Sequence, residues 1–222
     1  MTQAIEAYLL AVEVERARRA ADPWLTIRVQ EVKRFQHARF SATYSDLLAD
    51  PASSQAARFF LEELYGPMDF SRRDQQFRRV AAKVTVLFPG EIGRVVLSLA
   101  RLHALSEQLD SAMGAATADL PLVEASYCNS WRRVGRPEAR AEQISLVQEI
   151  GLALAKQVRR PLIRSSLRMM RGPAKAAGLD SLQSFLEAGF NAFQALPDAA
   201  AFVRTIAARE TAIAAALFES RD

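Results

Sequence analysis

Cysteine is almost missing from this sequence of 222 residues, in which Cys128 is the only one. A single cysteine excludes an internal disulfide and any cysteine-rich metal site. Cys128 follows Tyr127 and has no histidine beside it, so we interpret it as a packed side chain and not as a nucleophile. A cytoplasmic location follows as the default expectation.

Long apolar runs are also missing. No uninterrupted apolar stretch approaches the roughly 18 residues that a transmembrane helix needs. The amino-terminal segment MTQAIEAYLLAVEVERARR carries acids early and has no sustained apolar run, so it does not resemble a signal peptide. We therefore expect a soluble protein without a transmembrane segment.

The sequence lacks the common signatures of catalysis and of nucleotide binding. It contains no Gly-x-Gly-x-x-Gly, P-loop, Gly-x-Ser-x-Gly or His-Glu-x-x-His pattern. It has two histidines, His37 and His103, and no Glu-x-x-His pair, so the ligand set of a ferritin-like di-iron site is missing. These absences lower the expectation of an enzyme without excluding one, and we predict no metal.

What is present indicates an all-α protein. Half of the residues are hydrophobic, and apolar side chains recur at helical spacing along the whole chain. The pattern predicts a single domain over residues 1–222, built as a bundle of about eight to nine helices. The widest apolar face lies between Glu91 and Met113, which predicts a central helix. A loop over residues 114–119 is the expected boundary if the chain has two lobes.

The most distinctive stretch is FFLEELYGPMDFSRRDQQFRRV, from Phe59 to Val80. It is typical of a helix that stops at Gly66-Pro67 and of a second helix that begins near Ser71. We predict that Phe60, Leu61 and Leu64 are buried, and that Asp74 either caps the second helix or pairs with an arginine such as Arg78. The predicted structural corner comprises Phe59, Phe60, Leu61, Glu62, Glu63, Leu64, Tyr65, Asp69, Arg73, Asp74 and Arg78.

The carboxylates of this corner allow a second interpretation as an acid/base site. Glu62, Glu63, Asp69 and Asp74 lie close together in the sequence, and paired carboxylates catalyse reactions when their environments separate their pKa values. About as many arginines lie beside them, which favours structural ion pairs.

A basic segment follows the centre of the chain. From Ile150 to Leu179 there is no acid. A continuous helix would gather Arg160, Arg164, Arg168 and Arg171 on one face, beside an apolar sector. Such a face is typical of phosphate, nucleic-acid or anionic-membrane binding, or of a surface paired with acids such as Glu138, Glu142 and Glu149. The candidate anion-binding residues are Lys156, Arg160, Arg164, Arg168, Arg171 and Lys175.

His103 is a second candidate, on the apolar face of the central helix. Glu107 follows one helical turn later and is placed to orient the imidazole. The alternatives are a hydrogen-bonded core histidine, a ligand in a small-molecule or haem pocket, and an acid/base group. Haem is not excluded as a cofactor.

The stretch from Phe59 to Val80, FFLEELYGPMDFSRRDQQFRRV, resembles a family of uncharacterised bacterial proteins named for its first seven residues, FFLEELY. The resemblance covers about a tenth of the chain. It implies a bacterial origin and no catalytic residues.

Three functions therefore remain open at the level of sequence. The one that we favour is a non-enzymatic helical protein that acts through a partner or an anion at the basic segment. The alternatives are a small-molecule or haem binder near His103 and an enzyme that uses the corner carboxylates. The Ala-rich last helix could also support a homodimer.

Overall fold

The computed structural model describes the chain apart from residues 65, 67–69, 88–89, 118–121 and 220–222. The described residues form helices and no strand, which confirms the all-α class. The run KVTVLF, from Lys83 to Phe88, has the only strand-like pattern in the sequence, and its described part, to Leu87, belongs to the helix α5 (Ser71–Leu87).

The helices are more numerous than the eight or nine predicted, because short helices interrupt runs that were read as continuous. In chain order they are α1 (Thr2–Ala20), α2 (Pro23–Thr43), α3 (Ser45–Ala49), α4 (Ser54–Phe59), the π-helical turn η1 (Phe60–Leu64), α5 (Ser71–Leu87), α6 (Glu91–Ala116), α7 (Glu124–Val134), α8 (Pro137–Gln157), α9 (Pro161–Met169), α10 (Arg171–Ala176), α11 (Asp180–Gln194) and α12 (Ala199–Glu219).

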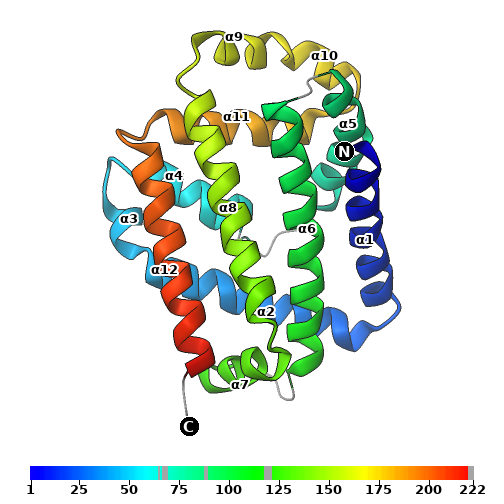
Figure 1. Cartoon of the computed structure of the whole chain (residues 1–222), viewed down its shortest axis with the longest axis vertical. Coiled ribbons are helices and arrows are strands. Elements are labelled where there is room, and N and C mark those ends of the chain that lie inside the picture. Colours follow the sequence, from blue (N-terminus) through cyan, green and yellow to red (C-terminus); the bar gives the residue numbers. More distant parts are fainter. Residues whose placement is uncertain (65, 67–69, 88–89, 118–121, 220–222) are drawn as a thin grey trace.

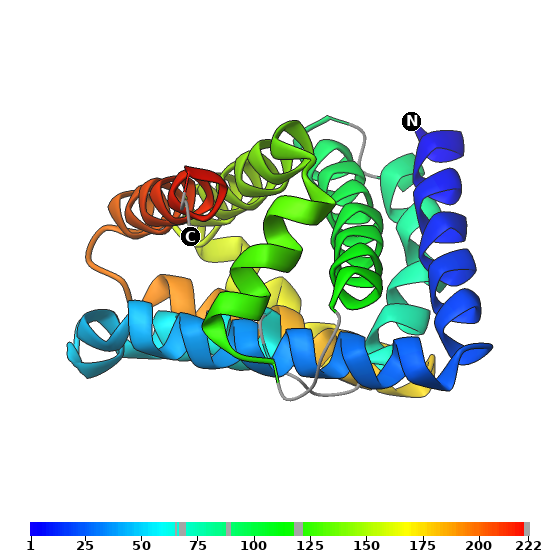
Figure 2. The same ribbon diagram turned by 90° about the horizontal axis from the view of Figure 1, so that it is seen from below.

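The helices form two layers (Figures 1 and 2). One layer holds α12, α8, α6, α5 and α1, whose axes are roughly aligned, with α5 and α8 antiparallel to the other three. Behind it, α2 and α11 cross the first layer. The long helix α6 contacts α1, α2, α5, α7 and α8, so the predicted central position of this helix is confirmed. Among the described residues, no helix combines the length and the apolar character needed to cross a bilayer.

The largest core lies where α4, η1, α8, α11 and α12 meet. Its aromatic members include Phe40, Phe60, Phe190, Phe193 and Phe202, all buried. Burying large aromatic rings contributes most of the apolar area of such a core. A second core joins α1, α5 and α6 through Ile5, Leu9, Ala81, Val96 and Ala100.

The dipeptide Asp-Pro, which often begins a helix, occurs at Asp22-Pro23 and at Asp50-Pro51, and the two have different local structures. The Asp22 carboxylate accepts a hydrogen bond from Leu25 N at 3.0 Å, so Asp22-Pro23 caps α2 as the sequence predicts. The Asp50 carboxylate accepts from Ala52 N instead, only two residues on, and a turn results. The next helix, α4, therefore begins at Ser54.

The predicted loop over residues 114–119 begins later than expected, because α6 continues to Ala116. Gly114 lies against α2, and a Cβ there would be 2.7 Å from Val29 Cγ2. Glycine at this position therefore serves close helix packing and does not end the helix. Residues 118–119 lie outside the described part of the chain.

Candidate functional site

The FFLEELY string forms the end of α4 and the π-helical turn η1. Phe60 is buried, with its ring centroid 6.0 Å from that of Phe193 and 5.6 Å from that of Phe202. Leu61 is partly buried against the same core. Leu64 is 45% exposed, so its predicted burial is wrong. A π-helical turn has a wider period than an α-helix, so the α-helical spacing behind that prediction does not continue past Phe60.

Phe59 attaches the string to α11. Its ring centroid lies 5.5 Å from that of Phe185, and a Cβ at Gly189 would lie 2.9 Å from Phe59 Cζ. Glu62 is exposed. Tyr65 and Asp69, both predicted members of the corner, lie outside the described residues.

Arg73 is the centre of the ion pairs in the corner. Its guanidinium lies 4.1 Å from the centroid of Phe70 and 4.4 Å from that of Phe185. Its Nη1 donates to the Glu63 carboxylate at 3.2 Å and to the Glu63 carbonyl at 3.1 Å. A planar guanidinium can stack on rings and donate hydrogen bonds at the same time, so Arg73 fastens the corner to α11.

Asp74 pairs with an arginine, as predicted, but its shortest contact is with an arginine of another helix; the neighbouring Arg73 Nε lies 3.5 Å from Asp74 Oδ1. Arg16 Nη2 on α1 donates to Asp74 Oδ2 at 2.5 Å. Arg78 pairs with Glu13 of α1, so the proposed helical pair between Asp74 and Arg78 does not form. The helix α5 begins at Ser71, and the Asp74 backbone N–H donates to the Phe70 carbonyl at 3.0 Å in its first turn.

Asp74 belongs to a larger group between α1, α5 and α6, which we call the charge cluster. It brings together two candidates that the sequence treated separately, Asp74 of the corner and His103 of the central helix. His103 Nε2 lies 3.5 Å from Asp74 Oδ2 and 3.4 Å from Glu107 Oε1. The members of the charge cluster are Arg16, Arg19, Asp74, His103 and Glu107.

Glu107 is the buried centre of the charge cluster. Arg16 donates to its Oε1 from Nε at 3.2 Å and from Nη2 at 2.9 Å. Arg19 donates to Oε2, and also to Ser111 Oγ at 3.2 Å. Each carboxylate oxygen of Glu107 is therefore occupied by a guanidinium, which offsets the cost of removing these charges from water.

The surroundings of Glu107 keep it ionised. Burial opposes the charged form, but a hydrogen bond from His103 and the charges of Lys33, Arg19 and Arg16 outweigh it, and the pKa of Glu107 lies well below its usual range. Asp110, one turn further along α6, behaves in the opposite way: burial raises its pKa, despite Lys33 Nζ at 3.7 Å. The two carboxylates thus have different environments on one helix face.

The sequence interpretation missed Arg16 and Arg19. Both lie in the run from Glu13 to Arg19, whose many charges are typical of an exposed helix end. The signal that could have found them is the spacing of Ile5, Leu9, Val12, Arg16 and Arg19, which alternates four and three residues and marks one helical face. The first three of these are buried core residues, and Arg19 is buried with them.

The charge cluster is arranged as a lock between helices. A general acid needs a proton to give near neutral pH, and Glu107 holds none there because its pKa is lowered. Arg16 Nη2 lies 3.2 Å from His103 Nε2, and the Asp74 and Glu107 carboxylates lie within 3.5 Å of the same nitrogen. Within the described residues, no group of three or more His, Cys, Asp or Glu side chains is placed to hold a metal ion.

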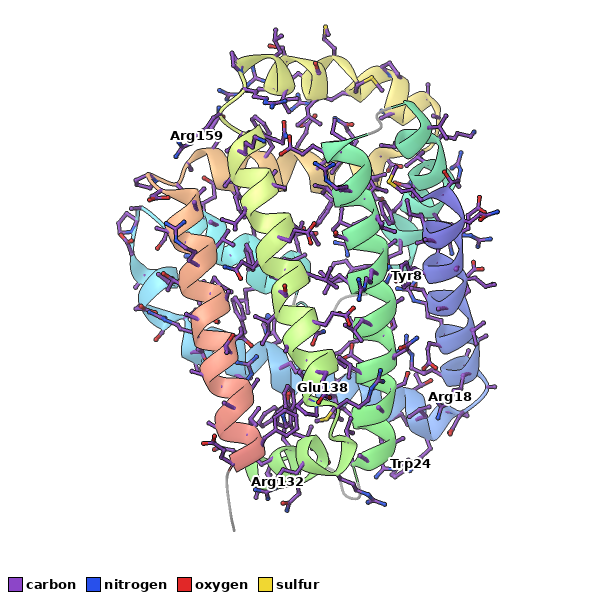
Figure 3. All side chains as sticks on the ribbon, viewed as in Figure 1. Tyr8, Arg18, Trp24, Arg132, Glu138 and Arg159 are labelled. Atoms are coloured by element: carbon purple, nitrogen blue, oxygen red, sulfur yellow. The ribbon has the colours of Figure 1, made fainter. Side chains whose placement is uncertain are left out.

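The basic segment forms the end of α8, then α9 and α10, at the end of the molecule opposite α7 (Figure 1). Arg159 lies where α8 meets the start of α9, far from Arg132 on α7 (Figure 3). The predicted continuous basic face is broken. Arg160 has an extended backbone before α9, and Arg171 begins α10, so Arg164 and Arg168 are the arginines within α9 itself.

Part of the basic segment is neutralised by acids, although not by the predicted Glu138, Glu142 or Glu149. Glu91 accepts from Lys156 at 2.8 Å and lies 3.9 Å from Arg160. Arg171 binds both oxygens of Glu187 and lowers the pKa of that carboxyl to about 2. Three exposed cations, Arg164, Arg168 and Lys175, have no acid within ion-pair distance in the described part of the chain.

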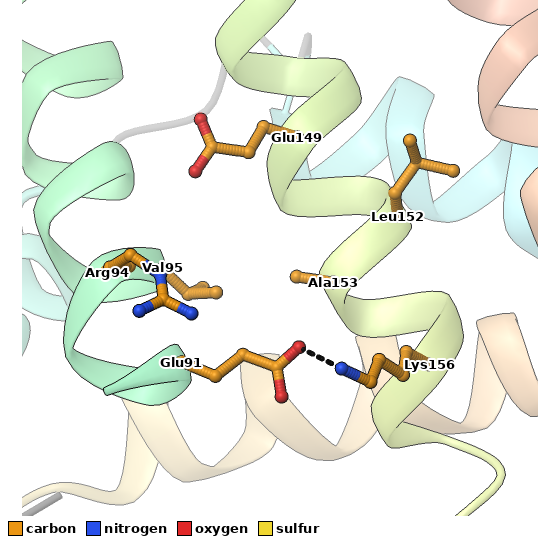
Figure 4. A pocket seen from close by; sticks show the side chains of 7 residues that line it. All are labelled: Glu91, Arg94, Val95, Glu149, Leu152, Ala153 and Lys156. Atoms are coloured by element: carbon orange, nitrogen blue, oxygen red, sulfur yellow. Dashed lines mark hydrogen bonds and ion pairs between the residues drawn. The ribbon is translucent and has the colours of Figure 1, made fainter. Parts of the chain in front are cut away.

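A shallow depression of about 270 Å³ lies between α6 and α8, next to this segment (Figure 4). Three of its four charged groups are engaged, since Glu91 pairs with Lys156 and Glu149 accepts from Ser98 Oγ at 3.1 Å. The fourth, Arg94, has no ion pair among the described residues. The depression therefore offers fewer free charges than the exposed side of α9. Its lining residues are Glu91, Arg94, Val95, Glu149, Leu152, Ala153 and Lys156.

Comparison with known proteins defines a family. The chain belongs to the family described as Domain of unknown function (DUF8198), which it matches over residues 15–222. This range includes Arg16 and Arg19 of the charge cluster and the whole basic segment. No curated protein and no solved structure matches the chain.

Proposed function

We propose that this protein is a non-enzymatic binding protein that holds an anionic partner on α9 and α10. The observation that carries the proposal is the exposure of Arg164, Arg168 and Lys175 without an acid within ion-pair distance in the described residues. Cations without a carboxylate in direct contact keep more of their charge available to a ligand. We call these three residues the free basic surface.

The neutralised cations define the limits of this surface. Lys156 and Arg160 share Glu91, and Arg171 is held by Glu187. An incoming anion would have to compete with these carboxylates. The proposed contact is therefore smaller than the whole predicted segment and lies on the outer side of α9.

The charge cluster supports binding over catalysis as the function. Its carboxylates are satisfied by Arg16 and Arg19, so the groups that an acid/base reaction would use already stabilise the packing of α1 on α6. The same contacts surround His103 Nε2, the atom that a haem iron would need.

The proposal is tested with a charge-reversal pair, Arg164→Glu with Arg168→Glu, in the full chain. The matched control reverses Arg58 and Arg133, which are also exposed but lie on α4 and α7. Binding is measured with a DNA duplex, inorganic polyphosphate and anionic phospholipid vesicles, at low and at physiological salt. Screening at higher salt weakens such contacts, so a salt-sensitive affinity is expected.

The expected result is that at least one of these anions binds, and that the α9 pair loses most of the affinity. Because each cation beside an anionic surface contributes on the order of 1 kcal/mol, reversing two of them should lower affinity by at least about tenfold. Equal loss in the Arg58 and Arg133 control would show a general charge effect and refute the proposed location.

A further inference from the structure

The free basic surface contains apolar side chains as well as cations. Leu162 is 78% exposed and Met169 is 72% exposed, although both belong to α9. At about 100° per residue, they lie on one side of the outward face, and Arg164 and Arg168 lie on the other. Single exposed apolar residues are common, but two large ones on a helix of nine residues, beside free arginines, form a mixed patch.

The opposite face of α9 accounts for how the helix is held. Ile163 and Leu167 are partly buried against the large core, and α9 packs mainly on α10 and α11. The Leu167 carbonyl also accepts from Gln183 Nε2 on α11 at 2.7 Å. The inward face of α9 is therefore packed against the rest of the protein. Leu162 and Met169 lie outside this contact, so their exposed side chains contribute little to the packing of the helix.

Because of the position of α9, a flat surface such as a membrane could contact this patch. The helix lies across one end of the molecule, outside the ends of α6 and α8 (Figure 1). The carboxyl end of α5 lies at the same end of the molecule, and it carries exposed Val86 and Lys83. Apolar and basic side chains thus occur together on more than one element there.

We propose that the anionic partner is a phospholipid bilayer surface, on which α9 lies flat. Leu162 and Met169 enter the boundary between headgroups and acyl chains, while Arg164, Arg168 and Lys175 contact lipid phosphates. A helix with apolar and basic sides is suited to the interface, because the apolar side contacts the acyl chains while the basic side contacts the anionic headgroups. This inference rests on the proposed function and names its ligand class.

Nucleic acid fits the same patch less well. Single strands are held by aromatic side chains that stack on bases, and the stretch from Arg159 to Leu179 contains no Phe, Tyr, Trp or His. Phosphate contacts on a duplex need cations but have no use for two exposed apolar side chains. A lipid surface would contact the exposed Leu162 and Met169 side chains, whereas a nucleic acid would leave them without a contact.

The test is co-sedimentation of the full chain with phosphatidylcholine vesicles, with and without about one third phosphatidylglycerol. Three proteins are compared: the natural chain, the pair Leu162→Gln with Met169→Gln, and the pair Arg164→Glu with Arg168→Glu. The matched apolar control is Leu10→Gln with Val14→Gln on α1, where the side chains are 60% and 59% exposed. Thermal unfolding of each variant checks that the fold is kept.

We expect binding to the anionic vesicles, little binding to phosphatidylcholine alone, and a loss on the order of tenfold for each α9 pair. The α1 control should bind like the natural chain. If the chain binds a DNA duplex but no vesicles, or if the Leu162 and Met169 pair binds vesicles unchanged, the lipid inference is wrong while the proposed function stands. If neither vesicles, DNA nor polyphosphate bind, both are wrong.

Discussion

Arg16 on α1 and Glu107 on α6 are joined by two hydrogen bonds to the same oxygen, Oε1, at 3.2 and 2.9 Å. The Glu107 side chain is 5% exposed and the Arg16 side chain is 29% exposed, so the carboxylate is buried and the guanidinium partly buried. Arg19 completes the contact from the next turn of α1. A long helix is thereby tied to the centre of the fold by charge as well as by apolar packing.

Replacing Glu107 by Gln should strongly destabilise the protein. The change leaves the buried Arg19 without its carboxylate and removes one of the two carboxylates that Arg16 binds, and breaking a buried pair costs about 3–5 kcal/mol. Glu142→Gln is the control, because Glu142 pairs with Arg101 on the surface, where such pairs contribute about 0–1 kcal/mol. Urea unfolding gives both values. A loss of similar size in the two variants would contradict the buried lock.

Acid should weaken the fold, and Glu107 should account for part of the effect. Its folded pKa is lowered, so the unfolded chain takes up the proton first as the pH falls. The stability from Glu107 is thus present above its unfolded pKa of about 4.3 and is lost progressively below it. Glu187, with a pKa of about 2, adds to the same trend. The free energy of unfolding should fall from pH 5 to pH 3, and more gently in Glu107→Gln. Parallel curves would refute the assignment.

Asp74 should couple to Arg16 and not to Arg78. A double-mutant cycle with Asp74→Asn and Arg16→Gln measures the first pair, and contacting charges couple by about 0.5–3 kcal/mol. The cycle of Asp74→Asn with Arg78→Gln is the control, since Arg78 pairs with Glu13. Coupling in the second cycle and none in the first would restore the helical pair that the sequence suggested.

Two residues of the FFLEELY string should respond differently to truncation. Phe60 is buried among Phe193 and Phe202, so Phe60→Ala should cost about 3–5 kcal/mol. Leu64 is nearly half exposed, and Leu64→Ala should cost less than about 1 kcal/mol. Chemical unfolding of the two variants decides it, and equal costs would contradict the change of helical period at η1.

Much of the fold follows from hydrophobic spacing. The central place of α6 and the cap of α2 at Asp22 are both readable in the sequence. Apolar periodicity reports which face is buried, however, and it does not report charges that continue that face. Arg16 and Arg19 were overlooked for this reason, although they extend the spacing of Ile5, Leu9 and Val12.

The basic segment shows a second limit of sequence reasoning. Its composition predicts a cationic surface, but tertiary packing decides which cations are free. Glu91 and Glu187 are distant in sequence from Lys156 and Arg171 and were not foreseen as partners. The break at Met170 also divides a face that one helical wheel had joined.

Hydrogen exchange of the full chain, with and without an anionic ligand, tests the central claim most directly. The ligands are a DNA duplex and, separately, vesicles that contain phosphatidylglycerol. The proposal predicts that at least one of them slows amide exchange in α9 and α10, while exchange in α7, at the opposite end, does not change. Protection at α7 in place of α9, or no protection of α9 and α10 by either ligand, would contradict it.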